Sequence, residues 1–187
     1  AGRIDLVVPA AQAFGTAQHA TPAGCLAMLD AMKRRGVVVR NLADIGTGTG
    51  LLAFAALRLW PAAHAVASDI DAVCEGVVAE HAALNAMAVG SGPRELAMVT
   101  AEGMDHPLLQ ARAPYDLLIA NILAGPLVEL AGDFADAVAR GGQLLLAGLL
   151  ERQEAAVRAA YRTAGFRLGA RLVNGDWSIL WLRGRAG

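Results

Sequence analysis

The 187-residue sequence predicts an α/β fold, with a mostly parallel seven-stranded sheet, helices on both faces and a C-terminal antiparallel hairpin. Strand-like and helix-like segments alternate along the chain, and a glycine-rich turn at residues 46–50 joins one such strand to a helix. The last two strand-like segments are separated only by Asn174-Gly-Asp176, which is typical of a hairpin. A 56% hydrophobic, 18% charged chain of this length suits one globular domain.

Short apolar runs supply the strands of the parallel part of the sheet. They are expected at residues 37–45, 65–68, 96–100, 115–120 and 143–147. Another short β-prone run covers residues 4–8, and the closing hairpin comprises residues 166–173 and 177–182.

Helix-capping residues and helix-breaking residues mark the ends of the helices between these strands. Thr21 and Pro22 predict an N-cap followed by Pro at the first helical position, and Gly36 ends that helix. Pro61 ends the apolar helix that begins at Leu51. Further helices are expected at residues 71–88, 126–140 and 151–164, whereas residues 101–114 read as a connector.

The closing hairpin narrows the fold class. Most dinucleotide-binding Rossmann domains do not end in an antiparallel hairpin, whereas class I, Rossmann-like methyltransferases usually do. The order of elements therefore favours a class I methyltransferase, whose cofactor would be S-adenosylmethionine.

Composition and charge argue against several other partners. The net charge of −1 and the absence of a basic run predict no direct nucleic-acid binding. The longest apolar stretch, residues 51–68, is interrupted by Arg58, Pro61 and His64, so we expect no membrane span. No secretory signal opens the chain.

The cysteines and histidines indicate neither disulfides nor a metal. Cys25 and Cys74 are isolated, which fits the reducing cytoplasm. His64, His81 and His106 lack metal-binding spacing, so no zinc is expected.

A ligand cleft is expected at the turn Asp44-Ile-Gly-Thr-Gly-Thr-Gly50. Glycines there let a ligand approach the backbone, and the following helix N-terminus suits a carboxylate. Asp69 ends the next strand, 19 residues after Gly50, where its carboxylate can accept hydrogen bonds from ribose hydroxyls. Leu51 replaces the third glycine of a dinucleotide fingerprint, which favours an adenosyl ligand over a pyrophosphate. Glu102 could face the adenine, or could be an ordinary solvated loop acid.

Several motifs resemble those of one protein family, in order and spacing. They are Ala13-Phe-Gly-Thr-Ala-Gln-His-Ala-Thr21, Asp44-Ile-Gly-Thr-Gly-Thr-Gly50, Asp69-Ile-Asp71, Asn121-Ile-Leu-Ala-Gly-Pro-Leu127, Gly148-Leu-Leu-Glu-Arg-Gln153 and Gly175-Asp-Trp-Ser178. The chain resembles the PrmA family over nearly its whole length. That resemblance implies methylation of ribosomal protein L11 on lysine and N-terminal amines.

The residue patterns and the family resemblance together give the residues expected in the cofactor site. The expected set is Phe14, Thr16, Thr21, Pro22, Asp44, Gly46, Gly48, Gly50, Asp69, Ile70, Glu102 and Asn121. The opening loop departs from the family pattern, because Ala17, Pro22 and Ala23 replace its second Gly, second Thr and Arg. Pro22 removes a hydroxyl that would contact the cofactor, so affinity or activity could be reduced.

Asn121 is the expected catalytic residue. Its side-chain carbonyl can accept a hydrogen bond from the acceptor amine and direct the nitrogen lone pair at the methyl group. Alternatively it could be a simple helix or turn cap. His19, in the opening loop, could orient the substrate, although a lone loop histidine is more often structural.

Residues 1–187 are expected to form a single catalytic domain. The family's separate N-terminal domain, which recognises the ribosomal protein, has no counterpart here, and the Ala start suggests a fragment. Three alternatives remain open: a cofactor-binding relative with weak catalysis, a methyltransferase for another protein or small amine, and a nicotinamide-dependent oxidoreductase.

Overall fold

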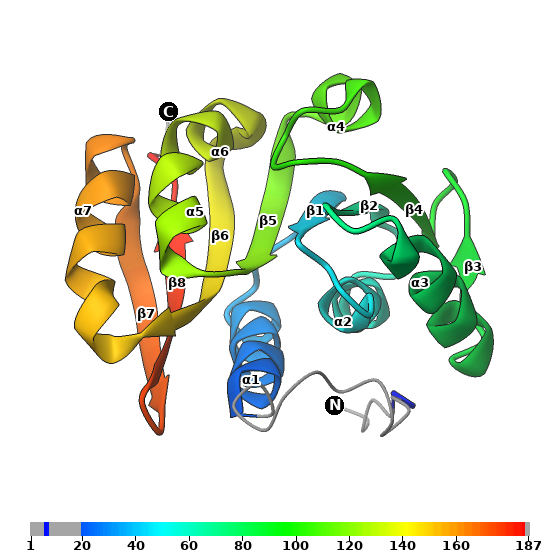
Figure 1. Ribbon diagram of the computed structural model, residues 1–187, viewed down its shortest axis with the longest axis horizontal. Coiled ribbons are helices and arrows are strands. Elements are labelled where there is room, and N and C mark those ends of the chain that lie inside the picture. Colours follow the sequence, from blue (N-terminus) through cyan, green and yellow to red (C-terminus); the bar gives the residue numbers. More distant parts are fainter. Residues whose placement is uncertain (1–5, 8–19, 186–187) are drawn as a thin grey trace.

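The computed structural model describes residues 6–7 and 20–185, which form a sheet between two layers of helices (Figure 1). The strands are β1 (Asn41–Ile45), β2 (His64–Asp69), β3 (Ala88–Val89), β4 (Glu95–Thr100), β5 (Tyr115–Asn121), β6 (Val138–Leu150), β7 (Arg167–Asn174) and β8 (Trp177–Arg183). The α-helices are α1 (Ala20–Arg34), α2 (Leu51–Leu59), α3 (Val73–Leu84), α4 (Pro107–Arg112), α5 (Ala124–Glu129), α6 (Ala131–Ala137) and α7 (Glu154–Thr163). A 3₁₀ helix, η2 (Glu151–Gln153), precedes α7.

The strand order is β3-β4-β2-β1-β5-β6-β8-β7. The strands from β3 to β6 are parallel, and β8 pairs antiparallel with both β6 and β7. This arrangement confirms the predicted parallel sheet with its closing hairpin. In the described part of the chain the sheet has eight strands instead of the expected seven, because β3 adds two residues at one edge.

The extra strand follows from an early end to α3. The sequence predicted a helix to residue 88, but α3 ends at Leu84 and Ala86 adopts a φ of 51°. A residue in the left-handed region cannot continue an α-helix. The chain therefore turns, and Ala88 and Val89 pair with Glu95 and Leu96.

Other differences lie in the connectors. The predicted connector 101–114 contains α4, in which Pro107 is the first residue and the His106 ring accepts the Leu108 N–H (3.1 Å). The helix expected from Pro126 is divided at Leu130 into α5 and α6. Helix α1 begins at Ala20, so Pro22 is its third residue, still within the turn whose N–H groups have no helical partner.

The sheet separates two hydrophobic cores. Alternate residues of each central strand point to opposite faces: in β5, Leu117 and Ile119 belong to the core under α1, α2 and α3, whereas Leu118 and Ala120 belong to the core under α4 to α7. The chain leaves β1 for β2 on one side and returns to β5 on the other. In open α/β sheets, ligands bind at such a switch point, beyond the carboxyl ends of the strands.

No helix in the described ranges is long and apolar enough to cross a membrane.

Candidate functional site

The glycine turn after β1 is tightly held. Gly46, Gly48 and Gly50 have φ values of 71°, 56° and 78°, a region that L side chains rarely adopt. The N–H groups of Gly46 and Thr47 both donate to the Ser68 carbonyl (2.8 and 2.9 Å). A Cβ at Gly46 would collide with the Ile122 side chain, whereas one at Gly48 would meet no atom of residues 6–7 and 20–185 within 4 Å. Within the described part of the chain, the turn therefore leaves space at Gly48, where a ligand can approach the backbone.

Asp44 fixes this turn from beneath. Its buried carboxylate accepts hydrogen bonds from the Thr47 hydroxyl (2.7 Å) and the Ala53 N–H (3.1 Å). Because the N-cap residue Gly50 has no side chain to cap α2, Asp44 caps the first turn of this helix instead. Burial raises the pKa of Asp44 to about 6, with a smaller contribution from the Asp69 carboxylate, although the two hydrogen bonds act in the opposite direction. These contacts make Asp44 a positioning residue for the turn.

Asp69 faces the turn from the end of β2. Its half-buried carboxylate accepts the Gly48 N–H (2.8 Å) through Oδ2 and the Asp71 N–H (3.1 Å) through Oδ1. The Cys74 thiol also forms a hydrogen bond with this carboxylate. Of its four lone pairs, one is therefore unoccupied and one is used only by this weak donor. Beside it, Ile70 leaves 70% of its surface exposed.

Glu102 follows β4, which lies on the side of β2 away from β1 and the glycine turn. Thr100 is the register partner of Asp69, and the Ala101 N–H donates to the Asp69 carbonyl (2.9 Å). Glu102, the next residue, is exposed at this edge of the sheet.

Asn121 ends β5 and is half-buried. Its side chain forms no hydrogen bond within the described part of the chain, so its amide is available to a substrate. The next residue, Ile122, is enclosed by two glycines: its side chain packs against Gly46, and a Cβ on Gly148 (φ 82°) would collide with its carbonyl. Two strand ends and the turn thus fix the backbone beside Asn121. The motif that begins at Gly148 does not indicate this packing role, because Ile122 and Gly148 lie far apart in the chain.

Helix α3 supports the turn through His81, for which the sequence predicted no role beyond the absence of a metal site. His81 is buried, and its Nδ1 lies 3.0 Å from the Thr49 carbonyl. A carbonyl only accepts, so Nδ1 carries a proton. One helical turn later, Asn85 accepts the Val7 N–H (2.8 Å) and donates to the Val7 carbonyl (2.9 Å). No spacing in the sequence indicated either contact.

The start of α1 lies close to the same site. Cys25 is buried. Burial, and to a lesser extent the charge of Asp44, raises the pKa of its thiol to about 12. Thr21, one turn earlier on the same side of the helix, is buried, and Pro22 is half-buried. Phe14, Thr16 and His19 lie outside the described residues.

Apart from Thr21 and Pro22 in α1, the expected site residues within the described ranges lie at one edge of the sheet, at the ends of β4, β2, β1 and β5. Among residues 6–7 and 20–185 no group of three or more His, Cys, Asp or Glu side chains could hold a metal ion.

Comparison with known proteins agrees with this architecture. Residues 3–185 match the sequence model of the family described as ribosomal protein L11 methyltransferase (PrmA). A ribosomal protein L11 methyltransferase of Brucella suis is 39% identical over 182 residues, which are 97% of this chain and 61% of the relative. The chain thus spans about three fifths of the length of the curated relatives it matches.

Two solved structures share the fold. The ribosomal protein L11 methylase of Lactobacillus delbrueckii subsp. bulgaricus has a TM-score of 0.74 and 25% identity, with 96% of this chain and 84% of that chain covered. Magnesium protoporphyrin IX methyltransferase of Synechocystis, solved with bound SAM, has a TM-score of 0.65 and 18% identity, with coverage of 87% and 77%. The family match and the 39% identity confirm the resemblance carried by the motifs, and the chain belongs to the PrmA family.

Proposed function

We propose that this chain is the catalytic domain of an S-adenosylmethionine-dependent protein N-methyltransferase of the cytoplasm. Its proposed acceptors are the lysine and N-terminal amines of ribosomal protein L11, the substrate named for its relatives. The observation that carries the proposal is the meeting of a glycine turn, Asp69 and Asn121 at one edge of the sheet.

The residues at this edge fit the cofactor. Asp69 can accept two ribose hydroxyls when one of them replaces the weak Cys74 thiol donor. The exposed apolar side chain of Ile70 can pack against the adenine. Open space at Gly48 and the N-terminus of α2 suit the amino-acid end of the ligand. Glu102 can accept from an exocyclic amine. We assign Phe14, Thr16, Thr21 and Pro22 to the same site from the family resemblance.

The methyl group comes from the sulfonium of S-adenosylmethionine, which already carries a good leaving group. The protein must present an uncharged amine in line with that group, whereas a free lysine has a pKa of about 10.4. The exposed apolar side chain of Leu123 lies two residues beyond Asn121 and can help to exclude water, which lowers the pKa of an enclosed amine. The Asn121 carbonyl can then accept an amine N–H and orient the lone pair.

A paired measurement of binding and turnover tests this assignment. We expect Asp69→Ala to weaken S-adenosylmethionine binding by about 100-fold in calorimetry, because two hydrogen bonds to a charged acceptor are lost. The matched control Asp71→Ala, an exposed carboxylate two residues away, should bind within a few-fold of the parent. Asn121→Ala should bind normally but transfer methyl groups to purified L11 at least about tenfold more slowly.

The alternatives predict different results. Tight binding without turnover in the parent chain would assign it to the catalytically weak relatives, which the missing hydroxyl at Pro22 favours. Methylation of another amine but not of L11 would show that L11 is not the substrate. Binding of NAD in place of S-adenosylmethionine would overturn the whole proposal.

A further inference from the structure

The charges of this protein are unevenly distributed along the chain. Residues 140–187 contain eight arginines and three acidic residues, whereas residues 1–139 contain eight basic and fourteen acidic residues. The C-terminal quarter is therefore strongly cationic in a protein whose net charge is −1. Such asymmetry is a common feature of proteins that bind polyanions.

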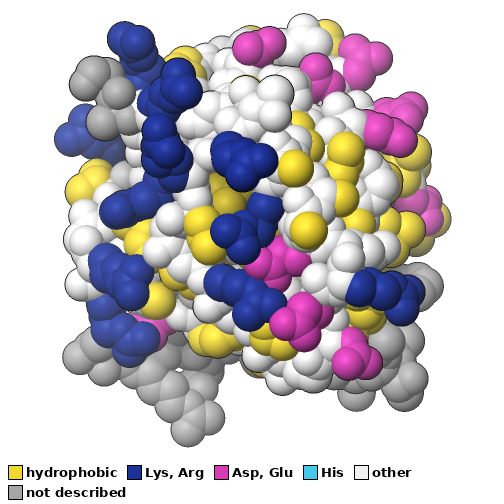
Figure 2. All heavy atoms as spheres, turned by 90° about the vertical axis from the view of Figure 1, so that its left-hand side faces the viewer, with side chains coloured by type: hydrophobic (Ala, Val, Ile, Leu, Met, Phe, Trp, Pro, Cys, Tyr) yellow, Lys and Arg dark blue, Asp and Glu magenta, His cyan; other side chains and the backbone are white. Residues whose placement is uncertain are grey.

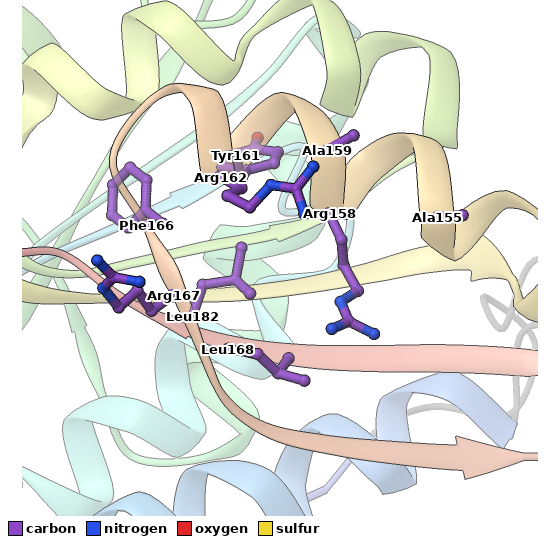
Figure 3. A pocket seen from close by; sticks show the side chains of 9 residues that line it. All are labelled: Ala155, Arg158, Ala159, Tyr161, Arg162, Phe166, Arg167, Leu168 and Leu182. Carbon is purple, nitrogen blue, oxygen red and sulfur yellow. The ribbon is translucent and has the colours of Figure 1, made fainter.

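The fold gathers arginines from this region on one side of the molecule. Figure 2 views the side that carries α7 and β7, and Lys and Arg side chains gather over it. A hollow of about 390 Å³ between α7 and the hairpin is lined by Arg158, Arg162 and Arg167. Arg158 and Arg162 project from α7, one turn apart, and Arg167 from the start of β7, around the apolar side chains of Leu168 and Leu182 (Figure 3).

The acidic groups nearby are already occupied. Glu154 accepts hydrogen bonds from Arg171 (2.6 Å), Arg158 (3.1 Å) and Ser178 (2.8 Å), and Glu151 accepts from Arg171 (2.6 Å). By contrast, the exposed guanidinium groups of Arg162 and Arg167 form no ion pair with any residue in the described ranges. These two cations are available to an external anion.

Two features indicate what kind of anion fits. Strand β7 is at the sheet edge, but its pairing with β8 shifts register between Leu168 and Ala170, an irregularity of the kind that discourages addition of another strand. This argues against an extended acidic peptide.

The aromatic rings beside the hollow, Tyr161 and Phe166, are buried, which leaves none for stacking on bases. Guanidinium groups without aromatic partners suit phosphates, which they bind in bidentate geometry.

We propose that the surface formed by Arg158, Arg162 and Arg167 binds the phosphate backbone of helical RNA, independently of base sequence. The choice of RNA rests on the proposed function, since a ribosomal acceptor protein works beside RNA. The sequence predicted no nucleic-acid partner because it contains no basic run. These arginines are separated along the chain, and α7 and β7 bring them together.

Binding of a short labelled RNA duplex, followed by fluorescence anisotropy over a series of salt concentrations, tests this surface. The parent should bind with an affinity that falls as salt rises, because each phosphate contact releases counterions. Arg162→Gln and Arg167→Gln should each weaken binding several-fold and reduce the slope of log K against log salt by about one. Arg94→Gln, an exposed arginine near the opposite edge of the sheet, is the matched control and should leave the slope unchanged.

Several results would overturn the RNA surface: no binding by the parent, an equal loss in the Arg94 variant, tighter binding of a DNA duplex, or equal competition by poly-glutamate. Methyl transfer to isolated L11 should stay at the parent rate in the Arg162 and Arg167 variants, since neither residue lies at the catalytic edge. If the parent bound RNA but failed to methylate L11, only the proposed function would be lost.

Discussion

A single buried carboxyl group, Asp44, connects the stability of this protein with the geometry of its glycine turn. It holds Thr47 and the first turn of α2 by two hydrogen bonds, yet its pKa of about 6 is well above the ordinary 3.8. This difference corresponds to about 3 kcal/mol against the ionised form at neutral pH. The hydrogen bonds that shape the turn therefore offset only part of the cost of burying the charge.

The pH dependence of stability should reveal this group. The pKa of Asp44 is higher in the folded state than in the unfolded state. The folded protein therefore becomes more stable as the pH falls below about 6, and this stabilisation is absent at higher pH. The contribution of Asp44 to the free energy of unfolding should therefore be roughly 1 kcal/mol more favourable at pH 5 than at pH 7.5. Asp44→Asn should remove this contribution in urea unfolding at the two pH values. The control Asp30→Asn, at a half-buried aspartate paired with Arg34 on the surface of α1, should retain it. An unchanged pH difference in Asp44→Asn would contradict the argument.

At the scale of the elements, Glu154 joins α7 to the C-terminal hairpin. Burial raises the pKa of its carboxyl, but hydrogen bonds from Arg171, Ser178 and Arg158 outweigh that effect and lower the pKa below its ordinary value. The charge is thus stabilised by partners on β7, on β8 and on its own helix. Its contribution to stability is present above the unfolded pKa and disappears as pH falls through the lowered folded value.

Removing this charge should loosen the contact between α7 and the hairpin. We expect Glu154→Gln to reduce the free energy of unfolding at neutral pH by about 2 kcal/mol, because two arginines lose a buried anionic partner. The neighbouring control Glu151→Gln removes a half-exposed ion pair and should change stability by less than about 1 kcal/mol. Equal effects of the two substitutions in chemical denaturation would show that burial of Glu154 does not matter.

At the scale of the whole molecule, the candidate site depends on the packing of both halves of the sheet. The ends of β2 and β4 approach the turn from one side, and the ends of β5 and β6, through Ile122 and Gly148, from the other. A ligand bound across this edge contacts elements that are separated by most of the chain. Its binding should therefore stabilise the domain as one unit.

Thermal unfolding measures that coupling directly. At about 100 times its dissociation constant, S-adenosylmethionine should add about 2.7 kcal/mol to the free energy of unfolding. For a domain of this size, that gain corresponds to a rise in Tm of roughly 5–10 °C. NAD at the same concentration should leave the Tm unchanged. A rise with NAD and none with S-adenosylmethionine would reverse the choice between an adenosyl and a dinucleotide ligand.

Local signals predicted much of the fold and part of the site. Glycines at the turn, Asp69 at the next strand end and the short hairpin connection are each visible within a few residues. The missed features, α4, the division at Leu130 and the strand β3, depend on caps and turns that are weak signals in isolation. Contacts such as His81 with Thr49 were not predictable, because they join residues 32 positions apart.

The sequence by itself determined the alternation of strands and helices, the glycine turn and the family, since these depend on short patterns of residue type. Only the tertiary structure decided how Ile122 is held between Gly46 and Gly148, and which arginines gather beside α7 and β7. The physical reason is that a short pattern of residue types determines the local backbone conformation and which face of a helix or strand is buried. Contacts between distant residues depend on strand order, register and helix packing, which no short stretch of the chain specifies.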